Sequence, residues 1–116
     1  MYVIRRTYKA KPGQARNAAL LLRQVADIYS QAGQRSQSLI YYNGGSLPCP
    51  NEELNLVYMQ WSTEIIDSPY REGNKFPDTG NSYKEFRDLL DDSDGPTSWI
   101  EFWEEVKWWF FTQDNR

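Results

Sequence analysis

The C-terminal end of this chain carries a dense run of aromatic side chains, and the chain has no histidine. Positions 99 to 111 hold four of the five tryptophans and three of the five phenylalanines. A buried aromatic side chain removes on the order of 150–250 Å² of surface from water, so the domain itself, a partner or a ligand must cover this segment. The missing histidine excludes the usual neutral-pH general base, the usual haem ligand and the commonest zinc ligand.

Length and composition predict one globular domain over residues 1–116. A fold of 116 residues buries roughly two-thirds of its unfolded surface, which is enough for one core. No run approaches the ~18 consecutive apolar residues of a membrane span, and the first residues lack the apolar stretch of a signal peptide. We therefore expect no membrane contact and a cytoplasmic location. The single cysteine, Cys49, excludes an internal disulfide and lies between two prolines without a base nearby, so we expect no chemistry there.

Charge is distributed unevenly along the chain. Residues 1–36 hold seven basic groups and one acidic group, whereas residues 37–116 hold six basic and fifteen acidic groups. One interpretation is that the two parts attract each other within the domain or across a dimer. The other is a basic face for anions, formed by Arg5, Arg6, Lys9 and Lys11. The net charge of −3 argues against general nucleic-acid binding, which depends on Lys and Arg contacts to phosphates.

Hydrophobic periodicity predicts the order strand, long helix, strand, strand, helix up to residue 90. The expected bounds are 2–9, 14–32, 36–43, 54–63 and 82–90. After that, Ser98 followed by Glu101 is a capping-box pattern and predicts a helix over 98–105, with a final strand over 107–113. A single long strand from Trp99 onward is the alternative.

This order predicts an α+β, ferredoxin-like βαββαβ domain with a four-stranded antiparallel sheet. Short, right-handed connections place both helices on one face and the first strand between the third and the fourth. The other face would carry Tyr and Trp side chains, and an exposed apolar face of that size predicts a partner.

Four features make the chain resemble the dimeric α/β-barrel superfamily, which includes antibiotic-biosynthesis-monooxygenase-like and NIPSNAP-like proteins. They are the N-terminal strand, the turn at 11–14 that opens a long helix, the middle pair of strands, and a strand ending Met-Gln-Trp-Ser-Thr-Glu at 59–64. The resemblance implies a homodimer in which two sheets pack face to face and each subunit encloses a pocket. It implies no required cofactor.

The chain departs from the catalytic members of that superfamily because several of them place a histidine after the third strand. Here residues 65–71 read Ile-Ile-Asp-Ser-Pro-Tyr-Arg, so haem-degrading and histidine-dependent reactions are excluded. Without histidine, proton transfer falls to Tyr, Asp, Glu or water. Tyr70 and Asp67 are the catalytic candidates that remain.

An aromatic pocket for a small apolar or aromatic ligand is the predicted site. The candidate ligand-binding residues are Tyr42, Tyr58, Trp61, Trp108 and Arg5. Plain core or dimer interface is the alternative for the aromatic residues, because such side chains dominate both. Arg5 and its neighbour Arg6 point to opposite faces of a strand, so one needs an acidic partner, for example Glu53, Glu104 or Glu105, or an anionic ligand.

Two further patterns are weaker. Asp92, Asp94, Gly95 and Glu101 match the later part of a calcium loop, but its first ligand position is Leu90, so we expect no metal site. The βαββαβ order also occurs in RNA-recognition domains, yet the third strand lacks their basic, glycine-containing signature. The sequence thus predicts a small-molecule-binding domain, with a cofactor-independent monooxygenase-like enzyme as one form of it. A non-catalytic homodimeric interaction or regulatory domain is the alternative.

Overall fold

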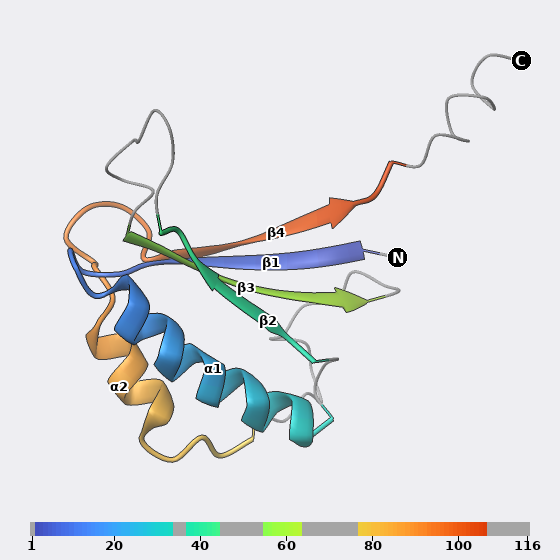
Figure 1. Cartoon of the computed structure of the whole chain (residues 1–116), viewed down its shortest axis with the longest axis horizontal. Coiled ribbons are helices and arrows are strands. Elements are labelled where there is room, and N and C mark those ends of the chain that lie inside the picture. The colour runs from blue at the N-terminus through green and yellow to red at the C-terminus, as the bar shows by residue number, and fades with distance from the viewer. Residues whose placement is uncertain (1, 34–36, 45–54, 64–76, 107–116) are drawn as a thin grey trace, which may run out of the picture.

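Four strands and two helices form a mixed α+β domain in which β1 lies inside the sheet. The computed structural model describes residues 2–33, 37–44, 55–63 and 77–106. Its elements are β1 (Tyr2–Lys9), α1 (Ala15–Gln31), β2 (Leu39–Tyr42), β3 (Leu56–Thr63), α2 (Ser82–Asp88) and β4 (Ser98–Glu104). The sheet is antiparallel with the order β2-β3-β1-β4, so the predicted central place of the first strand is confirmed (Figure 1). The arrangement is compatible with a ferredoxin-like fold.

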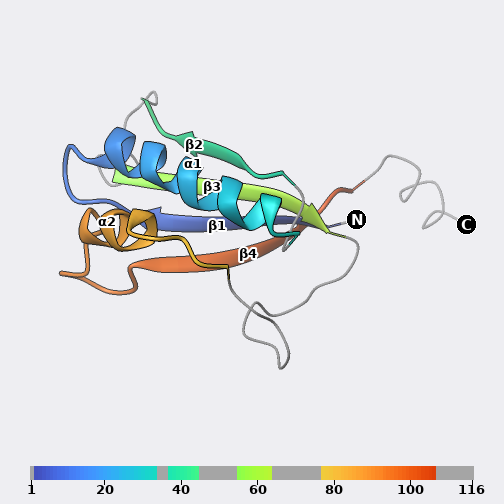
Figure 2. The ribbon, with the colours of Figure 1, turned by 90° about the horizontal axis from the view of Figure 1, so that it is seen from below.

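Both helices lie on the same face of the sheet, as predicted, and the opposite face carries no helix of the described residues (Figures 1 and 2). Tyr8 on β1 and Phe86 on α2 pack edge to face, with ring centroids 4.8 Å apart and planes at 85°. This contact assigns the even-numbered residues of β1 to the helix-covered face. The odd-numbered residues therefore belong to the other face, which we call the open face.

The core lies between the sheet and the helices. Small residues let α1 approach the strands closely: Ala15, Ala18, Ala19 and Ala26 are all buried. Phe86 and Val57 are fully covered. Leu22 and Val25 of α1 are buried as well, so one side of this helix forms part of the core. Neither helix in the described part of the chain is long and apolar enough to cross a membrane.

The predicted helix over 98–105 is wrong, because these residues form β4. The alternative of a strand starting near Trp99 is confirmed as far as Glu104. Residues 98 to 104 pair with residues 2 to 8 of β1 in unbroken antiparallel register. The helical spacing and the capping box compete here with an alternation of side chains. Pairing with the free edge of β1 favours the strand, because it satisfies the backbone hydrogen-bonding groups of both segments. The predicted strand over 107–113 lies outside the described residues.

Candidate functional site

The open face of the sheet combines aromatic, aliphatic and charged side chains. Register places Val3, Arg5, Thr7 and Lys9 of β1 on it, beside Tyr58 and Gln60 of β3 and Trp99, Glu101 and Trp103 of β4. Leu39 and Tyr41 of β2 belong to the same face, because they pair with Gln60 and Tyr58. Four large side chains of this face are between 37% and 52% exposed, namely Leu39, Tyr41, Trp99 and Trp103. Large apolar side chains thus remain accessible along this face.

Arg5 occupies the middle of this surface and is held from three sides. Its Nε donates a hydrogen bond to Oε1 of Glu101 at 2.9 Å. The guanidinium also lies over the rings of Tyr58 and Trp103, with its carbon 4.9 and 5.2 Å from their centroids. Cation–π contacts at this range are attractive and add to the ion pair. The positive charge of Arg5 is therefore engaged by residues of both neighbouring strands, β3 and β4.

Glu101 links the arginine to the tryptophan. Its Oε1 also accepts a hydrogen bond from Nε1 of Trp103 at 3.2 Å. Desolvation acts to raise the pKa of Glu101, but the hydrogen bonds from Arg5 and Trp103, the charge of Arg5 and a hydrogen bond from Trp99 outweigh it, so the pKa is lowered. Glu101 is consequently an anion at neutral pH, and its role is to fix Arg5 and Trp103 in place.

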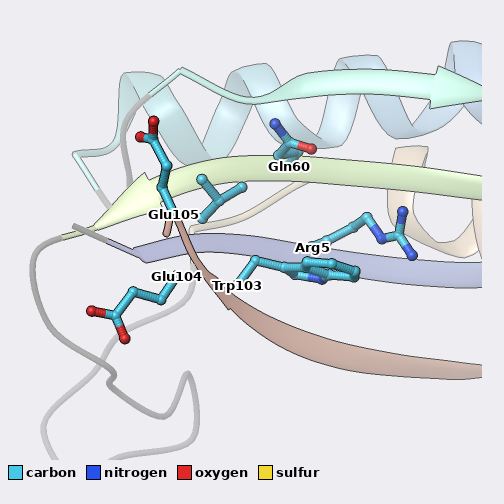
Figure 3. A pocket seen from close by; sticks show the side chains of 6 residues that line it. Arg5, Gln60, Trp103, Glu104 and Glu105 are labelled. Atoms are coloured by element: carbon cyan, nitrogen blue, oxygen red, sulfur yellow. The ribbon is translucent and has the colours of Figure 1, made fainter. Parts of the chain in front are cut away.

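A pocket of about 290 Å³ lies at the end of the open face next to this cluster. Its walls are formed by Val3, Arg5, Gln60, Trp103, Glu104 and Glu105. Figure 3 shows the Trp103 ring lying along the Arg5 side chain, Gln60 on the neighbouring strand, and the two glutamates pointing apart where β4 ends. The volume is at the lower end of the range for small-molecule sites, and the mixture of apolar and polar walls is typical of them.

The structure divides the predicted ligand-binding residues between two faces. Tyr58 and Arg5 meet on the open face, as described above. Trp61 pairs with Ile4 and packs against the core on the helix-covered face, and Tyr42 pairs with Val57 on that same face. The pleat of the strands thus places Tyr58 and Arg5 on one face and Trp61 and Tyr42 on the other.

Several predicted residues lie outside the described part of the chain, and their roles stay predictions. They are Trp108 of the ligand-binding set, the catalytic candidates Tyr70 and Asp67, Cys49, and the suggested arginine partner Glu53. The other suggested arginine partners, Glu104 and Glu105, do not pair with Arg5, because Glu101 stands directly opposite it in the register.

Basic groups of the first third of the chain engage the acidic C-terminal part, as the first interpretation of the charge pattern predicts. Besides the Arg5–Glu101 pair, Lys9 Nζ donates to the backbone oxygen of Asp94, and Lys11 Nζ donates to that of Asp88 at 2.9 Å. Arg6 faces the helices instead, where its guanidinium lies over Tyr8. The four basic residues thus do not form one anion-binding face.

The residues of the calcium-loop pattern do not lie together either. Asp92 and Asp94 stay in the turn before β4, whereas Glu101 lies on the strand and binds Arg5. Glu101, Trp103 and Gln60 are the site residues that sequence reasoning missed. The sequence signal for Glu101 and Trp103 was the alternation of residues 99, 101 and 103, which has the period of a strand. The prediction of a helix at 98–105 left this signal unused.

Comparison with known proteins adds no family assignment. No protein-family model matches the chain, and no curated protein matches its sequence at a significant level. The functional argument therefore depends on the open face and its pocket.

Proposed function

We propose that this protein is a homodimeric domain whose two subunits pack through their open sheet faces, in the manner of a dimeric α/β barrel. The observation that carries the proposal is the exposure of Leu39, Tyr41 and Trp99 on one face, outside the pocket at its end. Exposed large apolar side chains on both outer strands of one sheet face mark an interaction surface. A second copy of the same face supplies matching apolar surface, and such two-fold contacts are the commonest form of oligomer.

The charges of the open face support its burial against a partner. Burying an unpaired charge costs several kcal/mol, so a surface suited to an interface has its charges neutralised in advance. Arg5 is already paired with Glu101. Thr7, at the centre of the face, is already buried between its register partners Tyr58 and Trp99. Covering this surface would leave the charge of Arg5 compensated.

Binding of a small molecule is a second candidate function, and the pocket beside Arg5 and Trp103 favours it. The described side chains support binding more than a monooxygenase-like reaction. A general base works best when its pKa lies near the working pH, whereas the pKa of Glu101 is lowered and its carboxylate is occupied by two donors. We therefore assign the pocket a ligand and no reaction.

The dimer is tested by the solution mass of the full chain and of two matched variants. Leu39 on the open face and Leu20 on the outer side of α1 are exposed to a similar extent, 49% and 57%. The wild type is expected to have twice the mass of one 13.7 kDa chain by light scattering. Leu39→Glu should shift the population to the monomer, because it places a charge in the interface, while Leu20→Glu should remain dimeric. A monomeric wild type, or equal effects of both substitutions, would contradict the proposal.

A further inference from the structure

We propose that the pocket at the end of the open face binds an organic cation, namely a protonated amine carried by a small apolar or aromatic body. This inference rests on the small-molecule function proposed for the same pocket and names its ligand class. Three observations lead to it: Arg5 is already paired with Glu101, Glu104 and Glu105 have no cation partner among the described residues, and the wall beside them is an exposed, fixed indole.

The first observation concerns Arg5, the cationic side chain of the pocket wall. An arginine in a pocket ordinarily indicates an anionic ligand, since its guanidinium matches carboxylates and phosphates. Here the guanidinium already donates to Glu101 at 2.9 Å and lies against two aromatic rings. A ligand carboxylate would therefore meet a guanidinium whose charge Glu101 already compensates. Arg5 therefore acts as part of the wall rather than as an anchor for an anion.

The second observation concerns the two glutamates at the end of β4. Both Glu104 and Glu105 line the pocket and are exposed, and no cation in the described part of the chain pairs with either carboxylate. With Arg5 and Glu101 compensating each other, the carboxylates that remain at the rim of the pocket among the described residues are those of Glu104 and Glu105. Such a site attracts cations and repels anions.

The third observation concerns Trp103, which offers a cation a preferred surface. The indole is 52% exposed, although its Nε1 is bonded to Glu101 and Arg5 lies over the ring. These contacts fix the ring before a ligand arrives, so little conformational entropy is lost on binding. Ammonium groups bind to tryptophan rings more strongly than to other aromatic rings. An amine nitrogen over the ring face would also lie near the end of β4, which carries Glu104 and Glu105.

The remaining walls define the body of the ligand. Val3 contributes apolar surface, and Gln60 contributes an amide that can accept a hydrogen bond from an ammonium group. A pocket of about 290 Å³ fits one ring or a short chain rather than a large cofactor. A ligand with one protonated amine and one aromatic ring satisfies each of these walls.

The test uses three probes that share a phenyl ring and differ in charge: phenethylammonium, 2-phenylethanol and phenylacetate. Titration calorimetry on the full chain at pH 7 should show phenethylammonium binding about tenfold more tightly than the alcohol, the ratio expected from one cation–π contact and a nearby carboxylate. Phenylacetate should bind more weakly than the alcohol.

Charge variants then locate the site. In the double variant with Glu104→Gln and Glu105→Gln, the tenfold preference for the cation should fall to about twofold or less, while binding of the alcohol is retained. Glu85→Gln, on the exposed side of α2, removes a charge from the helix layer and should leave the preference unchanged. Trp103→Leu should weaken all three probes and the cation most.

The possible outcomes separate this inference from the proposals on which it depends. Preference for phenylacetate or for the alcohol would overturn the cationic class while leaving a small-molecule function in place. Binding of none of the probes would overturn both. An equal loss of preference in Glu85→Gln would overturn the assignment to this pocket. Selective binding of the cation by a monomeric protein would support the inference and count only against the dimer.

Discussion

Arg5 and Glu101 are separated by 96 positions in the sequence, yet Nε of one lies 2.9 Å from Oε1 of the other. They stand opposite each other where β1 pairs with β4, and each side chain is about one-third exposed. The same carboxylate oxygen accepts the indole hydrogen of Trp103. This pair therefore joins the first and last described strands and also sets the position of the pocket wall.

Removing the carboxylate should measure the contribution of this pair to stability. Glu101→Gln is expected to lower the free energy of unfolding by about 1 kcal/mol, because a charged hydrogen bond is lost at a partly solvated site. Glu104→Gln, on the same strand and without a described cation partner, should change it by less than about 0.5 kcal/mol. Urea denaturation measures both values. In a double-mutant cycle with Arg5→Gln, the coupling energy between the two residues should account for most of the stability lost in Glu101→Gln. A coupling energy near zero would contradict the contact.

The same pair should make stability depend on pH in a defined direction. The pKa of Glu101 in the folded protein lies below its ordinary value of 4.5, since the donors from Arg5 and Trp103 outweigh desolvation, which acts the other way. The unfolded chain therefore takes up this proton first as the pH falls. The contribution of Glu101 is complete above pH 4.5 and is lost as the pH falls through the folded pKa.

The measurement is the difference in unfolding free energy between wild type and Glu101→Gln from pH 7 to pH 3. It should be constant at neutral pH and shrink in the acid range. Taking this difference removes the contribution of Asp91, whose pKa is also lowered, chiefly by hydrogen bonds from Ser93. A difference that grows as the pH falls would be inconsistent with a lowered pKa.

The contact between Tyr8 and Phe86 should be essential to the core. Phe86 is fully buried, so Phe86→Ala is expected to cost about 3–5 kcal/mol, a large part of the roughly 5–15 kcal/mol that stabilises a small domain. Tyr83, three residues earlier on α2, is 41% exposed, and Tyr83→Ala should cost less than about 1 kcal/mol. Thermal unfolding of both variants provides the comparison. Similar losses in the two variants would show that α2 does not pack as described.

Gly33 should be required for its backbone conformation alone. It follows α1 with a φ of +76°, and a Cβ added there meets nothing within 4 Å. Gly33→Ala is therefore expected to cost about 1 kcal/mol through left-handed backbone strain and not through a clash. Gly44 is equally open but lacks a positive φ, so Gly44→Ala should be neutral or slightly stabilising. If the two substitutions have the same effect on the unfolding free energy, the capping role of Gly33 is wrong.

The candidate site was predictable only in part. The sequence placed Arg5 on the first strand and Tyr58 on the third, and their residue types indicated binding. It also placed Trp61 and Tyr42 in the same pocket, although Trp61 packs toward the core on the other face. The partner of Arg5 was missed because a pairing across 96 positions depends on strand register, which no local pattern near Glu101 encodes.

Local patterns along the chain determined β1, the middle strands and both helices, because the hydrophobic pattern of each segment agrees with the turn residues that flank it. They also determined that β1 is central, since short right-handed connections leave few other topologies. Only the tertiary structure decided the state of residues 98–104, where a helical spacing and a strand alternation coexist. The free edge of β1 selected the strand, since pairing there satisfies backbone hydrogen bonds along seven residues, and this choice turned Glu101 and Trp103 toward Arg5.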